Sequence, residues 1–399
     1  MILLAHPFGN ANVRAVLDAL SRVDLLAKFV TTLGWSNELS IAKQLPRRGY
    51  DLPARKIAAY PAREAIRLVA ARFGVKRVIE HERGWASIDS VWQELDRCAA
   101  GWVRDYRDKI TGVYAYEDCA LRAFEAATQT GARRIYDLPI AYWETSRQLL
   151  REEAARYPDW EPTLGGTRDS EEKLARKTRE LELAELVICP SEFVRESLPQ
   201  SARESKRCVV VPFGSPSVNA PLHGHTGRLR ILFAGAMTQR KGLADVFAAM
   251  KLVDSDAVEL VVMGSPLMPL AWYRERGHFT HEPPRPHGEV LRLMQSCDVL
   301  VLPSIVEGRA LVQQEAMACG LPLIATKNAG GDDLIREGET GFLVPIRSPE
   351  MLAEKITWCA THRDDLAGMG IAAQSRASEL TWRGYGDHVV SAIRDLIAA

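Results

Sequence analysis

The sequence has no surplus of charge of either sign, because its 51 Lys and Arg residues balance its 51 Asp and Glu residues. Whole-chain charge therefore gives no reason to expect a nucleic-acid partner. No apolar stretch approaches the roughly 20 residues that span a bilayer. The segment MILLAHPFGN lacks the basic region and the long apolar run of a signal peptide. We therefore expect the protein to lie in the cytoplasm.

Paired cysteines are also missing. The seven cysteines are scattered, with no C-x-x-C motif and no histidine at the spacing typical of a zinc site. We expect them to be reduced and mostly buried thiols. The chain shows neither a low-complexity tract nor an internal repeat of about 20 to 50 residues, which excludes the repeat architectures.

The chain has 399 residues, of which 47% are hydrophobic. This length and composition are enough for two domains, each with its own apolar core. Short apolar runs alternate with segments whose apolar residues have helical spacing. This alternation predicts an α/β fold, with parallel sheets flanked by helices. The predicted strands are Ile2–Ala5 and the segments KRVIE, TGVYAY, RRIYDLPI, LAELVICPS, CVVVPFG, RLRILFAG, AVELVVMG, CDVLVLPS, LPLIAT and GFLVP.

A domain linker is predicted where apolar content falls. The segment SPSVNAPLHGHTG is rich in Pro, Gly, Ser and His. We assign residues 1–214 to an N-terminal domain, 215–228 to the linker and 229–378 to a C-terminal domain. Residues 379–399 are expected to form a closing helix.

The clearest motif is LVLPSIVEGRALVQQEAMACGLPLIATKNAGGDDLIREGETGFLVP. An apolar strand ends at Pro303, a turn carries Glu307, and the following helix presents Glu315 eight positions later. A helix N-terminus beyond a strand offers unpaired N–H groups and partial positive charge, which suit a diphosphate. The two carboxylates instead suit the hydroxyl groups of sugar and ribose rings.

This segment resembles the retaining glycosyltransferases of family 4, also called group 1, over about residues 228–345. The resemblance rests on the Glu-x7-Glu spacing, on EAMACGLPLIAT, on the Gly330-Gly331 turn and on EGETGFLVP. It implies a GT-B fold, with two Rossmann-like, doubly wound parallel-sheet domains facing across a cleft and the final helix packing back on the first domain. It further implies that Glu307 contacts the donor sugar and Glu315 the ribose. The donor's sugar and diphosphate are expected at the amides of Gly308, Arg309, Ala310 and Leu311.

A second motif is ILFAGAMTQRKGLADVFAAM, in which Arg240 and Lys241 stand just before a helix. Adjacent cations at a helix start are unfavourable unless an anion binds there. In similar enzymes a lysine at the place of Lys241 neutralises the diphosphate, and Gly235 lies on the donor side. We therefore expect catalytic roles for Arg240 and Lys241, with no metal and no cofactor apart from the nucleotide sugar as co-substrate.

The sequence departs from the family pattern in two places on this half. Ala236 stands where many members have an arginine, so Arg240 is expected to share the task of Lys241. Arg309 follows Gly308 where Phe-Gly is frequent. Two interpretations of Arg309 are open, recognition of an acidic or unusual sugar and a side chain that points to solvent.

The acceptor half carries weaker signals. Gly9 and Asn10 follow the first strand, where family members use a Gly-rich loop that lets an acceptor approach the backbone. Asp137 stands where members often have a histidine. It is a catalytic candidate that accepts a hydrogen bond from a hydroxyl, or else it only caps the following turn.

A local basic excess runs from Lys43 to Arg83, with eleven Lys and Arg residues against four acidic ones. One interpretation is a solvated helical face. The other is attraction to anionic lipid or to a phosphorylated acceptor, which allows peripheral contact with the inner face of a membrane.

The expected activity is transfer of a sugar from a nucleoside-diphosphate sugar to an acceptor hydroxyl, with retention of configuration. By resemblance the acceptor is a polysaccharide or other glycan, a lipid-linked sugar or a small glycoside. Two other classes stay open. A non-transferring enzyme on the same scaffold, such as an epimerase or a phosphorylase, would convert donor without acceptor or need phosphate. A binding-only protein would do neither.

Overall fold

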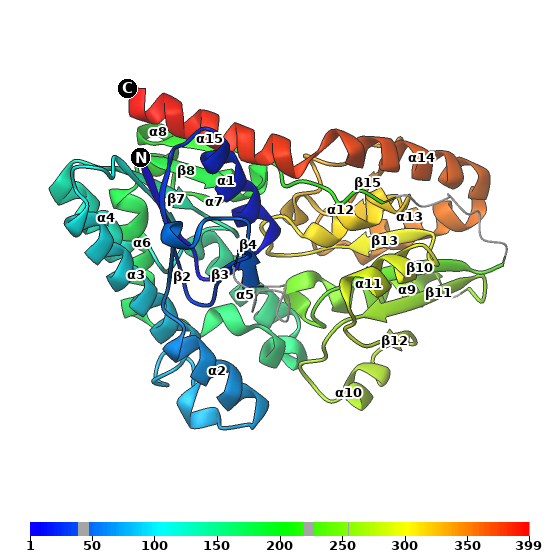
Figure 1. Ribbon diagram of the computed structural model, residues 1–399. Helices are drawn as coiled ribbons and strands as arrows, with labels where there is room; N and C mark the ends of the chain where they lie inside the picture. The colour runs from blue at the N-terminus through cyan, green and yellow to red at the C-terminus, as the bar shows by residue number, and fades with distance from the viewer. Residues whose placement is uncertain (39–47, 219–226, 254, 399) are drawn as a thin grey trace.

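The computed structural model describes residues 1–38, 48–218, 227–253 and 255–398. The predicted α/β fold is confirmed, because two parallel sheets are each flanked by helices and stand side by side (Figure 1). Among the helices that the structure describes, none combines the length and apolar character that crossing a membrane requires.

The N-terminal sheet has seven strands in the order β5-β2-β1-β6-β7-β8-β9. Their bounds are β1 Ile2–Ala5, β2 Leu26–Thr31, β5 Ile57–Ala59, β6 Gly112–Tyr116, β7 Arg133–Asp137, β8 Leu186–Cys189 and β9 Arg207–Val210. A small pair, β3 Trp35–Ser36 and β4 Gly49–Tyr50, stands apart. The helices of this domain are α1 Ala11–Arg22, α2 Ala62–Arg72, α3 Ile88–Asp105, α4 Leu121–Thr130, α5 Trp143–Arg156, α6 Glu171–Leu183, α7 Glu192–Ser197 and α8 Gln200–Ser205.

The C-terminal sheet has six strands in the order β12-β11-β10-β13-β14-β15. Their bounds are β10 Leu229–Ala234, β11 Val258–Met263, β12 Thr280–Glu282, β13 Val299–Leu302, β14 Leu323–Ala325 and β15 Gly341–Leu343. The helices are α9 Leu243–Val253, α10 Leu270–Arg274, α11 His287–Met294, α12 Leu311–Ala318, α13 Pro349–Thr361, α14 Arg363–Glu379 and α15 Trp382–Ala398. In both sheets the neighbouring strands run parallel, so their carboxyl ends lie at one edge.

The apolar residues of the strands form separate cores for the two sheets. The C-terminal sheet packs its helices around Ile231, Leu232 and Val301, all fully buried. The N-terminal sheet has a core on each face, and one of them includes Val389 and Ile393 of α15. The last helix therefore lies on the N-terminal domain, beside α1 (Figure 1).

One strand prediction fails in the N-terminal domain. The segment KRVIE, predicted as a strand, instead contains a 3₁₀ turn at Lys76–Val78. Its five residues follow Gly74, whose φ of 69° turns the chain at the end of α2, and they reach no neighbouring strand. Strands β2, β3, β4 and β5 were not predicted. The longest of them is β2, LAKFVT, which lies between β5 and β1 in the sheet. Most of the predicted linker, residues 219–226, lies outside the described ranges.

Candidate active site

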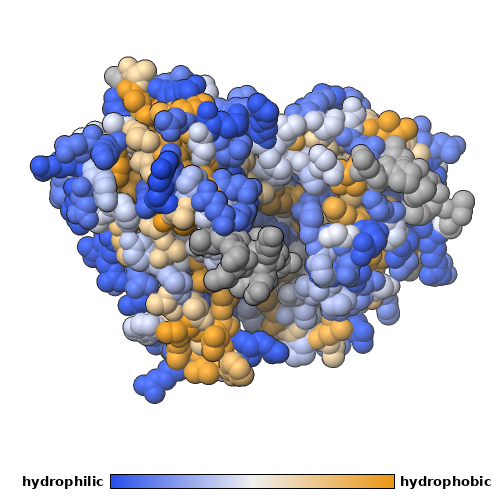
Figure 2. Space-filling view, viewed as in Figure 1, coloured by the Kyte–Doolittle hydropathy of each residue, from blue (hydrophilic) through white to orange (hydrophobic). Residues whose placement is uncertain are grey.

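A cavity of about 610 Å³ lies between the two domains, at the carboxyl ends of their strands. Asn10 and Tyr116 line it from the N-terminal domain, while Lys241, Glu307 and Glu315 line it from the C-terminal domain. Figure 2 shows the molecule hollowed between its two halves. Several residues predicted from separate motifs therefore share one cavity, at the place where open α/β sheets bind ligands.

Lys241 and Glu307 line the cavity, and they form an ion cluster with Arg240, which is not among the lining residues. The Glu307 carboxylate accepts a hydrogen bond from Lys241 Nζ at 2.5 Å, and Arg240 Nη1 lies 3.2 Å from the same oxygen. Arg240 also donates to the Val306 carbonyl at 2.8 Å, which ties the turn after β10 to the loop after β13. Two cations face one carboxylate, so the cluster keeps a surplus of one positive charge.

The electrostatics of Glu307 follow from this pairing. Burial alone raises the pKa of its carboxyl, but Arg240 and Lys241 outweigh burial and lower that pKa from 4.5 to about 2. Glu307 is therefore an anion throughout the neutral range, able to accept hydrogen bonds from hydroxyl groups.

Gly235 leaves room for the lysine. Its φ is 142°, and a Cβ atom there would lie 2.8 Å from Cδ and Cε of Lys241. A side chain at this position would thus press on the lysine stem as well as strain the backbone. The predicted donor-side position of Gly235 therefore has a physical reason, the approach of Lys241 to the backbone.

The turn that carries the two cations is held by Gln239, which the sequence reasoning missed. Gln239 is fully buried and donates from Nε2 to Glu153 of α5 and to Asp245 of α9, at 2.8 Å each. Its Oε1 accepts from the backbone N–H of Ala244 at 2.8 Å. Because α5 belongs to the N-terminal domain, this side chain joins the cation turn to both domains.

Glu315 lies on α12, where its carboxylate approaches Nδ1 of His287 at 3.5 Å. Burial raises the pKa of Glu315, and His287 counteracts part of that rise. His287 also lines the cavity, from the start of α11. His287 was not predicted as a site residue, because a single histidine after a proline-rich loop belongs to no motif.

The loop from Gly308 to Leu311 leads into α12 against the other domain. Ala310 is the N-cap of α12 and provides no capping side chain, and Ala310, Leu311 and Val312 line the cavity at this end of the helix. Gly308 touches the N-terminal domain, since Ser191 Oγ donates to its carbonyl at 2.6 Å. A Cβ atom on Gly308 would overlap the Pro139 carbonyl oxygen.

Comparison with known proteins agrees with this geometry. Residues 228–362 match the family model described as glycosyl transferases group 1. This match covers most of the C-terminal domain, which we call the group 1 domain. The resemblance predicted from the Glu-x7-Glu motif and its neighbours is thereby confirmed.

A relative of the group 1 domain is a D-inositol 3-phosphate glycosyltransferase of Corynebacterium diphtheriae. It is 29% identical over 226 residues, covering 52% of this chain and 50% of the relative. The chain thus spans about half the length of the curated relatives it matches.

Solved structures extend the likeness to the whole fold. A sucrose-phosphate synthase of Thermosynechococcus elongatus covers 100% of this chain and 99% of its own, with a TM-score of 0.67 and 18% identity. The Anabaena protein HepE in complex with UDP-glucose covers 99% of each chain, with a TM-score of 0.61 and 16% identity. At these identities the likeness shows the GT-B fold.

Within the group 1 domain, one of the two interpretations of Arg309 is wrong. Its side chain does not point to solvent, because it is fully buried and donates from Nε to the Pro190 carbonyl at 2.6 Å. It also bonds the carboxylate of Asp333 at 2.5 Å. Arg309 lines the cavity and at the same time anchors the group 1 domain to the N-terminal one.

On the acceptor side, only one of the predicted residues lines the cavity. Asn10 does so, at the N-terminus of α1. Gly9 lies against Tyr50 and Arg14, whose Nε donates to its carbonyl at 2.9 Å. Asp137 ends β7 and is 4% exposed, with burial raising its pKa to about 7, and it is not part of the cavity wall. Its catalytic role stays a prediction.

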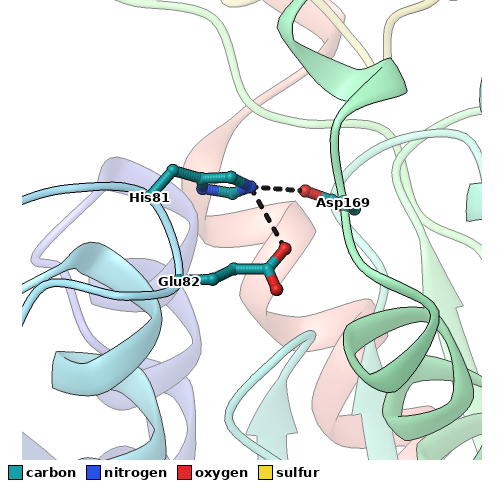
Figure 3. Close-up of side chains that lie close together, drawn as sticks. All are labelled: His81, Glu82 and Asp169. Carbon is teal, nitrogen blue, oxygen red and sulfur yellow. Dashed lines mark hydrogen bonds and ion pairs between the residues drawn. The ribbon is translucent and has the colours of Figure 1, made fainter.

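A cluster with ligand-type side chains lies apart from the cavity. Figure 3 shows Nε2 of His81 facing the carboxylates of Glu82 and Asp169, at 3.2 and 3.1 Å. The ammonium of Lys173 lies 3.0 Å from Asp169 and 3.0 Å from Asp89. Because this ammonium already supplies positive charge, the arrangement is an ion-pair network that joins α6 to the start of α3.

Proposed function

We propose that the chain is a glycosyltransferase that moves a sugar from a nucleoside-diphosphate sugar to an acceptor hydroxyl with retention of configuration. The observation that carries the proposal is the ion cluster of Arg240, Lys241 and Glu307, of which Lys241 and Glu307 line a cavity between the two domains. The match of residues 228–362 to glycosyl transferases group 1 supports it, as does the fold shared with a UDP-glucose complex.

The cation pair suits the diphosphate of such a donor. Arg240 and Lys241 hold one positive charge beyond what Glu307 neutralises, and the uncapped N-terminus of α12 faces the same space. These groups stabilise the negative charge that develops on a departing diphosphate. We assign that task to the side chains and the helix amides, with no divalent metal.

The carboxylates suit the hydroxyl groups at the two ends of the donor. Glu307 stays ionised and lies beside the cations, and we assign it to the transferred sugar next to the diphosphate. Glu315 stands on α12 within the same wall, and we assign it to the ribose. We assign His287, which lies beside Glu315, to the nucleoside part as well.

The chemical step then needs only one proton transfer. The acceptor oxygen bonds to the anomeric carbon on the face from which the diphosphate leaves, and the leaving diphosphate oxygen takes the acceptor's proton. Closure of the two domains over the cavity excludes water and so limits donor hydrolysis. The acceptor, a glycan or a lipid-linked sugar, enters from the side of Asn10 and Tyr116.

The proposal is tested by incubating the protein with uridine, guanosine, adenosine and thymidine diphosphate sugars and a panel of glycoside acceptors. We expect one donor to be consumed only when an acceptor is present, with the product's anomeric proton showing the donor's configuration by NMR. Conversion without acceptor would assign an epimerase, and dependence on inorganic phosphate a phosphorylase. Binding without any conversion would assign a binding protein.

A further inference from the structure

Helix α2 buries its acidic residue and exposes apolar side chains, which is the opposite of an ordinary surface helix. Its one carboxylate, Glu64, is 1% exposed and pairs with Arg67 at 2.7 Å. Its apolar residues Ile66, Leu68 and Val69 are 43, 42 and 57% exposed. A helix on a globular domain normally buries the apolar stripe and exposes the charges.

The exposed apolar residues continue beyond the helix. We call them the α2 patch, defined as Ile66, Leu68, Val69, Phe73, Val75 and Trp85. Phe73 is 78% exposed and Trp85 is 54% exposed. Figure 2 shows a hydrophobic area on the part of the surface where Figure 1 places α2, at the lower end of the N-terminal domain. Contiguous exposed apolar surface of this kind marks an interaction site.

Cations surround the α2 patch. Arg72, Lys76 and Arg77 are exposed within and beyond the last turn of α2, and no ion pair joins them to another described residue. The side chain of Arg83 is 84% exposed and lies 3.9 Å from the carboxylate of Glu80, which is itself exposed. These residues belong to the basic stretch singled out in the sequence, of which Lys43 and Arg47 lie outside the described ranges. A solvated polar face does not account for the apolar side chains between them.

We propose that the α2 patch docks on an anionic lipid bilayer. Aliphatic and aromatic side chains would enter the boundary between headgroups and acyl chains, while Arg72, Lys76 and Arg77 would contact lipid phosphates. Long basic side chains suit this position because their stems lie on apolar surface and their charges reach the headgroups. The charge complementarity with an anionic membrane favours this partner over an electrically neutral protein surface.

The inference goes beyond the proposed function and does not depend on it. No residue of the α2 patch lines the cavity between the domains. Docking and sugar transfer can therefore be measured separately, and a failure of one leaves the other intact.

The test uses the full-length protein and vesicle co-sedimentation. Vesicles contain phosphatidylcholine alone or with about one-third phosphatidylglycerol, at low and at physiological salt. We expect binding to the anionic vesicles only, weakened by salt. Two variants separate the contributions, Val69→Ser with Phe73→Ser for the apolar part and Arg72→Glu with Lys76→Glu and Arg77→Glu for the charge. Each should lower the partition coefficient at least about tenfold.

Matched controls change the same chemistry elsewhere. Leu267→Ser with Ile371→Ser alters apolar residues that are 54 and 59% exposed, outside the patch. Lys251→Glu with Arg292→Glu and Arg383→Glu reverses three exposed cations. Both controls should bind anionic vesicles like the wild type, and thermal unfolding should show that every variant is folded.

Three results would overturn the proposal. One is no sedimentation of the wild type with anionic vesicles at low salt. Another is equal binding by the patch variants and the wild type. The third is a dimer in sedimentation equilibrium that Val69→Ser with Phe73→Ser dissolves, without vesicle binding, which would assign the α2 patch to a second copy of the chain.

Discussion

The two domains contribute to the same cavity in different ways. The C-terminal domain supplies Lys241, Glu307 and Glu315, each within a recognisable motif. The N-terminal domain supplies Asn10, Tyr116 and Pro139, which lie at or beyond the ends of strands and belong to no equally specific motif. The residues proposed for the donor are therefore recognisable from short sequence motifs. The residues on the acceptor side come together only through the packing of the two domains.

The largest expected effect is on the donor side. Lys241→Ala removes the cation that bonds Glu307 and leaves the diphosphate with Arg240 alone. We expect turnover to fall about a hundredfold or more, measured as nucleoside diphosphate release with acceptor present. Lys251→Ala, an exposed lysine on α9, should leave turnover unchanged. A folded Lys241→Ala variant with full activity would exclude the proposed role of the cation pair.

A second change, Gly308→Ala, alters the contact between the two domains. In Gly308→Ala, the added methyl group would overlap the Pro139 carbonyl oxygen, so the loop after β13 must withdraw from the N-terminal domain. We expect turnover to fall about tenfold or more, because a displacement of catalytic groups by about 1 Å can lower the rate about a hundredfold. Gly368→Ala on α14, where a Cβ atom meets nothing within 4 Å, is the matched control. Equal activity of the two variants would show that the domain contact does not position the site.

A third change, Gln239→Ala, removes a buried side chain that joins the two domains. Gln239→Ala leaves the carboxylates of Glu153 and Asp245 without their amide donor. The free energy of unfolding should fall by about 2 to 4 kcal/mol, measured by urea denaturation. Turnover should fall as well, since the cation turn loses its anchor. Gln200→Ala on the surface should change stability by less than about 0.5 kcal/mol.

The ion cluster also predicts a pH dependence of stability. The pKa of Glu307 falls from 4.5 to about 2 on folding, so its contribution is present above pH 4.5 and is lost as pH falls toward 2. The stability advantage of the wild type over Glu307→Gln, on the order of 3 kcal/mol at neutral pH, should therefore shrink as acid is added. An advantage independent of pH between 5 and about 3 would contradict this account.

The smallest effect is expected at the nucleoside end. Glu315→Ala should weaken nucleoside diphosphate affinity about tenfold by removing the ribose hydrogen bonds, with turnover at saturating donor little changed. Isothermal titration calorimetry measures the affinity directly. Glu289→Ala, a change in the first turn of α11, serves as the control. An unchanged affinity in Glu315→Ala would remove the ribose assignment.

Much of the group 1 domain could be predicted because its signals are local. Strand β13 and the turn with Glu307 follow one another in the chain, and the parallel sheet brings the turn after β10 beside them. In the N-terminal domain, the segments that were predicted wrongly are those whose structure depends on tertiary contacts. The segment KRVIE has strand-like composition but no neighbour to pair with, and α2 exposes the residues that periodicity alone would bury.

The missed site residues have the same cause. Gln239 gains its role from Glu153, a residue 86 positions earlier, and no pattern in the chain links the two. Arg309 was visible as a departure from the family pattern, but its burial against Pro190 depends on the packing of the second domain.

The central claim is that Arg240, Lys241 and the α12 N-terminus bind the diphosphate of a nucleotide sugar. The most direct measurement compares thermal unfolding with uridine, guanosine, adenosine or thymidine diphosphate against the same nucleoside without phosphates, in the presence of EDTA. We predict that one diphosphate at about a hundred times its Kd stabilises the wild type by roughly 2.7 kcal/mol. Its nucleoside, and the Lys241→Ala variant, should show little stabilisation. Equal shifts with nucleoside and diphosphate, or no shift with any of the four, would contradict the claim.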